Sequence, residues 1–156
     1  MSEIRDNLEI VRRSIEEVCQ RAGRDASEVT LIAVSKTKPV PMLEEAYEGG
    51  ARDFGENKVQ EIQAKYGSLP DDVRWHMIGH LAAQQGSSGF GKGRLIHSVD
   101  SLRLARQIEE EAAKKNMEVD ILLEINVAKE ESKYGFFMED AEAAIREIST
   151  FPHVHI

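Results

Sequence analysis

Lys36 is the residue whose setting points most directly to chemistry. It follows residues 29–35, an apolar and partly β-branched run that predicts a strand buried on both faces. The amine should emerge at the carboxyl-terminal rim of a sheet, where α/β folds place their ligand sites. Partial desolvation and a second cation favour the neutral amine, which can form an imine with a carbonyl, and in an extended chain Lys38 would be that cation. An ordinary solvated lysine pair fits the same residues.

Four other polar residues lie where predicted strands end. Asn57 lies where a strand becomes a helix, His80 follows a strand, and Ser98 and Asn126 stand near the ends of two more. Asn57 could instead cap a helix, and His80 could be a hydrogen-bonded structural histidine. Together with Lys36, the four would line one rim of a parallel sheet and form a ligand pocket.

The loop over residues 130–135 contains Lys133, which could reach an anionic ligand or could be part of a solvated connection. Trp75 and Tyr134 are predicted to be packing residues rather than stacking platforms, because no basic residues surround them in the sequence. His76 and His80 stand four apart without the glutamate of a zinc-protease motif or an obvious third ligand, so no metal site is predicted.

Strand and helix patterns alternate along the chain. Apolar periodicity, glycines and prolines predict these elements. Strands are expected over residues 29–35, 52–55, 73–79, 95–99 and 120–127, and helices over 3–22, 41–48, 56–66, from Asp100 or Ser101 through Ala112, and 138–149. Residues 153–156 resemble the start of a further strand.

Successive strand–helix units predict a parallel sheet within one α/β domain over residues 1–156. The sheet is either doubly wound and open or an incomplete (β/α)8 barrel, since a closed barrel needs about 250 residues. The chain stops where a strand begins, and this favours the incomplete barrel with about five to six units. The glycine- and serine-rich residues 84–93 interrupt the alternation of strands and helices. They predict a flexible loop, and a phosphate-binding loop is the functional alternative.

Composition narrows the classes of partner. The formal charge of −8 and pI near 5.2 argue against a nucleic-acid backbone or an anionic membrane as partner, because both require a basic face. The amino terminus lacks the apolar core of a signal peptide, and no apolar run of about 18 residues could span a bilayer. The single cysteine, Cys19, is predicted to be a buried, inert thiol, and the cytoplasm is the expected location.

Five segments in order resemble the pyridoxal phosphate homeostasis protein family. They are residues 33–38 (AVSKTK), 54–61 (FGENKVQE), 75–81 (WHMIGHL), 95–101 (LIHSVDS) and 130–135 (EESKYG). The resemblance covers nearly the whole chain and implies the barrel of the alanine-racemase fold type, with Lys36 at the position of the family's Schiff-base lysine. It also implies that pyridoxal 5'-phosphate (PLP) is the cofactor.

Two departures from the family accompany this resemblance. Family members usually continue the His-Leu segment with glutamine and then Asn-Lys, whereas residues 82–85 here are Ala-Ala-Gln-Gln. Family chains also run further, and that portion supplies the last strands and the groups that grip the cofactor phosphate. The resemblance therefore implies a truncated form, whose exposed strand edges favour self-association, whereas the full-length family form is expected to be monomeric.

The leading hypothesis is a PLP carrier or buffer that holds the aldehyde on Lys36, releases it to apo-enzymes, and contributes to vitamin B6 and amino-acid homeostasis. Sequestration requires an imine-forming amine and an anion site, but no base that removes a substrate proton. The rival is a PLP-dependent amino-acid racemase, which needs acid–base groups on both faces of the cofactor. No tyrosine or histidine identifies itself as the second base. The third hypothesis is a binding module with an open sheet and no cofactor, in which Lys36 is an ordinary lysine at a strand end.

Overall fold

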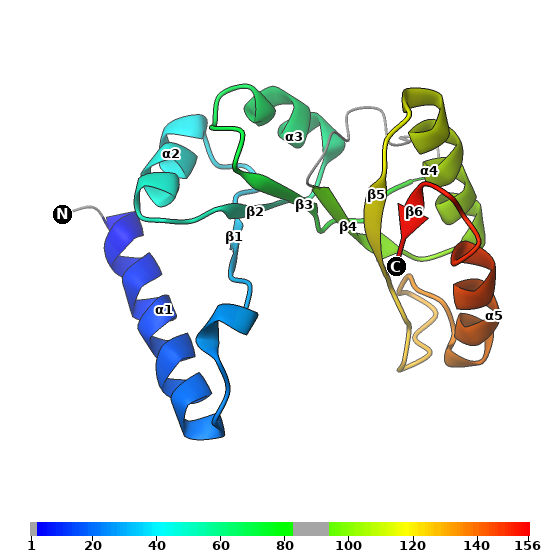
Figure 1. Ribbon diagram of the computed structural model, residues 1–156, viewed down its shortest axis with the longest axis horizontal. Helices are drawn as coiled ribbons and strands as arrows, with labels where there is room; N and C mark the ends of the chain where they lie inside the picture. The colour runs from blue at the N-terminus through cyan, green and yellow to red at the C-terminus, as the bar shows by residue number, and fades with distance from the viewer. Residues whose placement is uncertain (1–2, 83–93) are drawn as a thin grey trace.

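The computed structural model describes residues 3–82 and 94–156 (Figure 1). The glycine- and serine-rich residues 84–93 lie outside the described residues, so neither interpretation of them is tested. Strands and helices alternate from α1 to β6 as the sequence patterns predict, except between β3 and β4, where the described residues contain no helix.

Six strands form one sheet in which every neighbouring pair is parallel and the spatial order follows the sequence. The strands are β1 (Ile32–Val34), β2 (Asp53–Glu56), β3 (Arg74–Met77), β4 (Arg94–Val99), β5 (Val119–Leu123) and β6 (Val154–His155). Parallel neighbours require a crossover connection, which is usually a helix, and a sequential parallel order is the arrangement found in β/α barrels.

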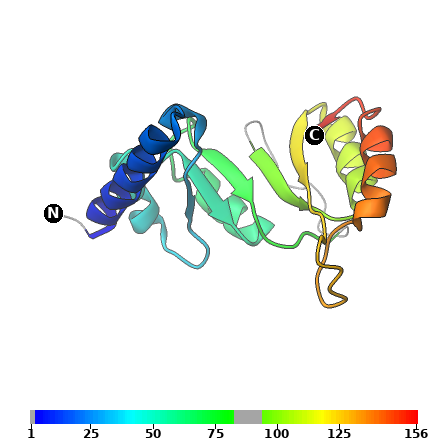
Figure 2. The ribbon, with the colours of Figure 1, turned by 90° about the horizontal axis from the view of Figure 1, so that it is seen from below.

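The helices lie around the outside of the curved sheet (Figures 1 and 2). They are α1 (Glu3–Ala22), α2 (Val40–Glu48), α3 (Val59–Tyr66), α4 (Leu102–Lys115) and α5 (Met138–Ile148), with a short 3₁₀ turn η1 (Ala26–Glu28) after α1. Local signals fix several of their ends. The Ser101 hydroxyl accepts a hydrogen bond from the Leu104 N–H and caps α4, and Asn116 closes this helix in the left-handed conformation.

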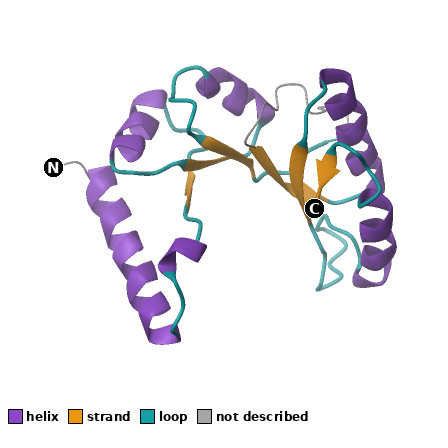
Figure 3. Ribbon diagram, in the orientation of Figure 1, coloured by secondary structure: helices purple, strands orange, loops and turns teal. Residues whose placement is uncertain are grey.

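Figure 3 shows the strands with the helices around them. The hydrophobic core lies between these two layers and consists of buried side chains from both. Phe54 and Trp75 meet there with ring centroids 6.0 Å apart, and Ile62, Ile96 and Ile121 are at most 1% exposed. Trp75 is therefore a packing residue, as predicted, and the buried Cys19 also matches its prediction.

The prediction that the first strand is buried on both faces is wrong. Strand β1 extends only from Ile32 to Val34, and 55% of Val34 is exposed. Successive residues of a strand face opposite sides, so Ala33 packs on the core while Val34 faces the concave side of the sheet. This strand also occupies one edge of the sheet, opposite β6 at the other edge.

Other predicted boundaries shift by a few residues. The strand expected over 120–127 ends at Leu123, after which Ile125 forms an isolated bridge with Phe136. The strand expected over 73–79 ends at Met77, and residues 78–80 already belong to the rim. Among the described residues, no helix is both long and apolar enough to cross a membrane.

We predict that Gly79→Ala destabilises the fold by about 1–3 kcal/mol, because an added Cβ would lie 2.4 Å from the Asn57 carbonyl oxygen. Gly67→Ala is the matched control. Gly67 has helical backbone angles and open space around it, so alanine should change stability by less than about 1 kcal/mol. Urea unfolding of both variants checks the difference, and equal midpoints would contradict the close packing at Gly79.

Candidate functional site

The carboxyl-terminal ends of the parallel strands form one rim that carries the residues predicted from the sequence. Lys36 follows β1, Asn57 follows β2, His80 follows β3, Ser98 is the second-last residue of β4, and Asn126 follows β5. Because neighbouring strands are paired in parallel, their carboxyl-terminal ends lie side by side, and these five residues lie along the same rim of the sheet.

Lys36 lies in a turn rather than on an extended strand. Thr37 has a φ of 62°, and the Lys38 N–H donates to the Ser35 carbonyl at 3.1 Å. The expectation that Lys36 and Lys38 lean to the same side in extended chain is therefore wrong. Lys38 instead lines a shallow hollow that includes Met42 and Leu43 of α2.

The Lys36 side chain is exposed at this rim. Within residues 3–82 and 94–156, its amine has no hydrogen bond or ion pair. A free amine at the open end of a parallel sheet has the accessibility that reaction with a carbonyl requires.

Sequence analysis missed a buried polar cluster below this turn. The Glu56 carboxylate is fully buried and accepts hydrogen bonds from the Ser35 hydroxyl at 2.6 Å and the Lys65 ammonium at 2.7 Å. Lys65 also donates to the Ser35 carbonyl at 2.9 Å. The spacing of Glu56 and Lys65 along the chain gives no signal of this contact, because α3 must first fold back onto β2.

His80 stands in a ring stack at the rim. Its ring lies 3.7 Å from that of Tyr134, with an interplanar angle of 15°, and its Nδ1 lies 3.4 Å from an Asp100 carboxylate oxygen. The prediction that Tyr134 is a packing residue is wrong, since 57% of it is exposed. The loop after β5 folds across the rim, and this long-range contact brings Tyr134 to His80.

Ser98 and Asn57 both contact Gly79. The buried Ser98 hydroxyl donates to the Gly79 carbonyl at 2.6 Å. Asn57 is half-buried with its backbone against Gly79, and α3 is capped by Lys58 without a side-chain hydrogen bond. The helix-cap alternative for Asn57 is therefore wrong.

Asn126 shapes the loop that follows β5. Its side-chain amide donates to the Glu130 carbonyl at 2.9 Å and its side-chain oxygen accepts from the Glu130 N–H at 3.2 Å. Lys133, in the same loop, is exposed. The buried Asn126 thus holds the start of this loop through both of its hydrogen bonds to Glu130.

A second polar cluster crosses the concave side of the sheet. His76 bonds the Asp53 carboxylate through Nε2 at 2.9 Å and the Nε2 of His97 through Nδ1 at 2.9 Å. Burial lowers the pKa of His97, and the neighbouring His76 lowers it further. Burial alone would raise the pKa of Asp53, but hydrogen bonds from Arg74 and His76 outweigh it and hold that pKa below its usual value.

The residues described contain no group of three or more histidine, cysteine, aspartate or glutamate side chains placed to hold a metal ion.

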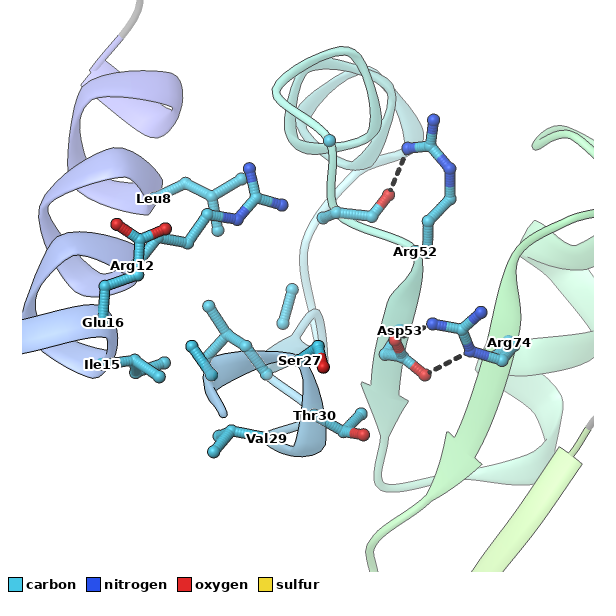
Figure 4. Close-up of a pocket in the computed structure, with 15 residues that line it drawn as sticks. Leu8, Arg12, Ile15, Glu16, Ser27, Val29, Thr30, Arg52, Asp53 and Arg74 are labelled. Atoms are coloured by element: carbon cyan, nitrogen blue, oxygen red, sulfur yellow. Dashed lines mark hydrogen bonds and ion pairs between the residues drawn. The ribbon is translucent and has the colours of Figure 1, made fainter. Parts of the chain in front are cut away.

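A cavity of about 410 Å³ lies at the opposite end of the sheet from Lys36, between α1 and the starts of β2 and β3 (Figure 4). Two of its arginines are already paired, Arg74 with Asp53 and Arg52 with Asp72. None of the five rim residues lines this cavity, so it is separate from the rim.

Comparison with known proteins gives matches along almost all of the chain. The family model for the alanine racemase N-terminal domain matches residues 6–156. The pyridoxal phosphate homeostasis protein of Aquifex aeolicus is 38% identical over 152 residues, which are 97% of this chain and 67% of that protein.

Solved structures match as well. An unknown protein from Bifidobacterium adolescentis has a TM-score of 0.90 at 30% identity, over 99% of this chain and 67% of its own. PipY of Synechococcus elongatus with PLP bound has a TM-score of 0.70 at 32% identity, over 91% of this chain and 66% of its own. The predicted fold is confirmed: the six parallel strands are part of an alanine-racemase-type barrel that is more extensive in longer relatives.

The lowered pKa of His97 predicts a pH dependence of stability. The unfolded chain takes up this proton at higher pH than the folded chain, so stability is lost as the pH falls through the ordinary histidine value of 6.5 toward the folded value. His97→Gln keeps a donor toward His76 but does not titrate, so its Tm should fall less between about pH 7.5 and about pH 5.5. His155→Gln, at an exposed histidine of β6, is the control and should behave like the parent. Parallel Tm curves for His97→Gln and the parent would contradict this account.

Proposed function

Because the chain belongs to the pyridoxal phosphate homeostasis protein family, we propose that it binds PLP as a Schiff base on Lys36 and carries or buffers the cofactor. In this role it delivers PLP to apo-enzymes and contributes to vitamin B6 and amino-acid homeostasis. The observation that carries the proposal is the exposed amine of Lys36, at the rim and in a turn whose flanking residues are hydrogen-bonded to Glu56 and Glu61.

The residues at this rim fit the aldehyde end of PLP. When bound, the cofactor supplies a carbonyl carbon that reacts with an amine. Lys36 provides that amine, which is exposed at the rim in the turn that follows β1. The exposed His80–Tyr134 ring stack offers a flat surface at the same rim, against which an aromatic ring can pack.

The other predicted residues have supporting parts in this proposal. Asn57 and Ser98 set the backbone at Gly79 beside His80, and Asn126 holds the loop that brings Tyr134 to the rim. Lys38 and Lys133 are exposed cations near the turn and on the loop, respectively, and are secondary candidates for contact with an anionic group.

A racemase-like enzyme is the second candidate. Its specific support is the contact between His80 and Asp100 at the rim, because a histidine oriented by a carboxylate can transfer protons. Carrying PLP requires no such step, so turnover separates the two functions.

We predict that Lys36→Ala abolishes the adduct with PLP. The parent chain should develop visible absorbance when mixed with PLP, and borohydride reduction should leave the modified lysine at position 36 by mass spectrometry. Lys114→Ala, at an exposed lysine of α4 that pairs with Glu111, is the matched control and should retain the adduct. An adduct that is absent from the parent, or distributed equally among its lysines, would sink the proposal.

The racemase-like function is tested by measuring the racemisation of alanine and other amino acids by the PLP-loaded chain. A carrier predicts no turnover above that of free PLP. Turnover that disappears in His80→Gln would establish the racemase-like function instead.

We also propose that the chain self-associates through its exposed strand edges. β1 and β6 are the outer strands of the sheet, and exposed Val34 and Leu122 add apolar surface near them. Val34→Lys places a charge at this edge and should shift sedimentation velocity toward monomer, with Val127→Lys in the exposed loop after β5 as the control. A parent chain that sediments as a monomer at all concentrations would contradict self-association.

A further inference from the structure

The turn that carries Lys36 is held on both sides by one cluster of side chains, formed by Ser35, Glu56, Glu61 and Lys65. Ser35 is 3% exposed, Glu56 is fully buried and Lys65 is 7% exposed. These groups belong to β2, α3 and the end of β1. They join three segments at the point where Lys36 leaves the sheet.

On the amino-terminal side of Lys36, the hydroxyl, the carbonyl and the N–H of Ser35 all form hydrogen bonds. Its hydroxyl donates to Glu56 Oε1, and its carbonyl accepts from the Lys65 ammonium. The Ser35 N–H donates to the Gly55 carbonyl of β2 at 2.9 Å. The residue before Lys36 is thus fixed through its backbone and its side chain.

On the carboxyl-terminal side, the Thr37 N–H donates to Glu61 Oε1 at 2.7 Å. This hydrogen bond lowers the pKa of the Glu61 carboxyl, so the acceptor remains ionised at neutral pH. The bond stabilises a residue whose φ of 62° an L-amino acid rarely adopts. Lys65 lies between the two carboxylates, 2.7 Å from Glu56 and 3.6 Å from Glu61.

A stability role alone does not account for this cluster. Buried ion pairs cost desolvation, and apolar residues of similar volume serve stability as well or better. One oxygen of Glu56, Oε2, is buried without a partner among the described residues, which adds to the cost. The bonds of the cluster converge on the two residues that flank a free amine.

We infer that Glu56, Glu61 and Lys65 are positioning residues for Lys36, which fix the turn so that its amine is directed to the aldehyde of PLP. This inference rests on the proposed function. In the reaction, the amine nitrogen attacks the aldehyde carbon, the carbonyl oxygen leaves as water with two protons from the amine, and a carbon–nitrogen double bond remains. A fixed turn has already lost the backbone freedom that the reaction would otherwise remove.

Glu61→Gln is the first test variant, because Glu61 is partly exposed and its replacement should leave the chain folded. Glu56→Gln is the second and keeps the shape of the buried side chain. Glu142→Gln, which breaks an exposed ion pair with Arg146 on α5, is the matched control. Circular dichroism and urea unfolding establish that each variant is folded before binding is compared.

We expect Glu61→Gln and Glu56→Gln to weaken the PLP adduct at Lys36 about tenfold, which corresponds to about 1.4 kcal/mol. Hydrogen exchange at the Thr37 amide should accelerate in both variants. Reductive methylation of Lys36 by formaldehyde should stay unchanged, because formaldehyde requires no particular direction of approach. A purely structural role predicts no selective change in PLP binding among folded variants.

The outcomes separate this inference from the proposed function. If the parent forms the adduct and the folded variants bind PLP as tightly as Glu142→Gln, the inference is overturned and the proposed function stands. If the parent forms no adduct, the proposed function fails. Unchanged exchange at Thr37 in Glu61→Gln overturns the inference in either case.

Discussion

The buried ion pair between Glu56 and Lys65 is the interaction on which the geometry of the rim depends. It lies within a layer otherwise filled by apolar side chains such as Phe54 and Ile62, where an unpaired charge would be strongly destabilising. The pair is tolerated because Ser35 supplies both a donor and an acceptor. As a result the ends of β1 and β2 and the last turn of α3 are held as one unit.

The two faces of the sheet divide the polar chemistry between them. Alternation along β2 turns Asp53 toward the concave side and Glu56 toward the helices, so one short strand anchors both polar clusters. The Asp53–His76–His97 cluster links β2, β3 and β4 within the sheet, whereas Glu56 links the sheet to α3. The first cluster contributes a pH dependence to stability, and the second acts on the turn at Lys36.

Local sequence signals predicted the order of elements and the residues at strand ends, because periodicity, caps and glycines act over a few residues. They did not predict contacts that require the folded chain. Val34 is exposed because β1 is an edge strand whose inner face is uncovered, and Tyr134 meets His80 only after the loop folds back. Lys65 is buried because α3 folds back onto β2, a contact that periodicity within the helix does not reveal. The five rim residues could be predicted because parallel topology alone brings strand ends together.

The position of Lys36 just beyond the ladder follows from how backbone groups are satisfied there. After the bond from the Ser35 N–H to Gly55, the Ser35 carbonyl and the Thr37 N–H have no strand partner within residues 3–82 and 94–156. Side chains replace the strand, since Lys65 bonds the Ser35 carbonyl and Glu61 bonds the Thr37 N–H. In the turn, the backbone on both sides of Lys36 is fixed by these side chains, while the amine remains exposed and available for reaction.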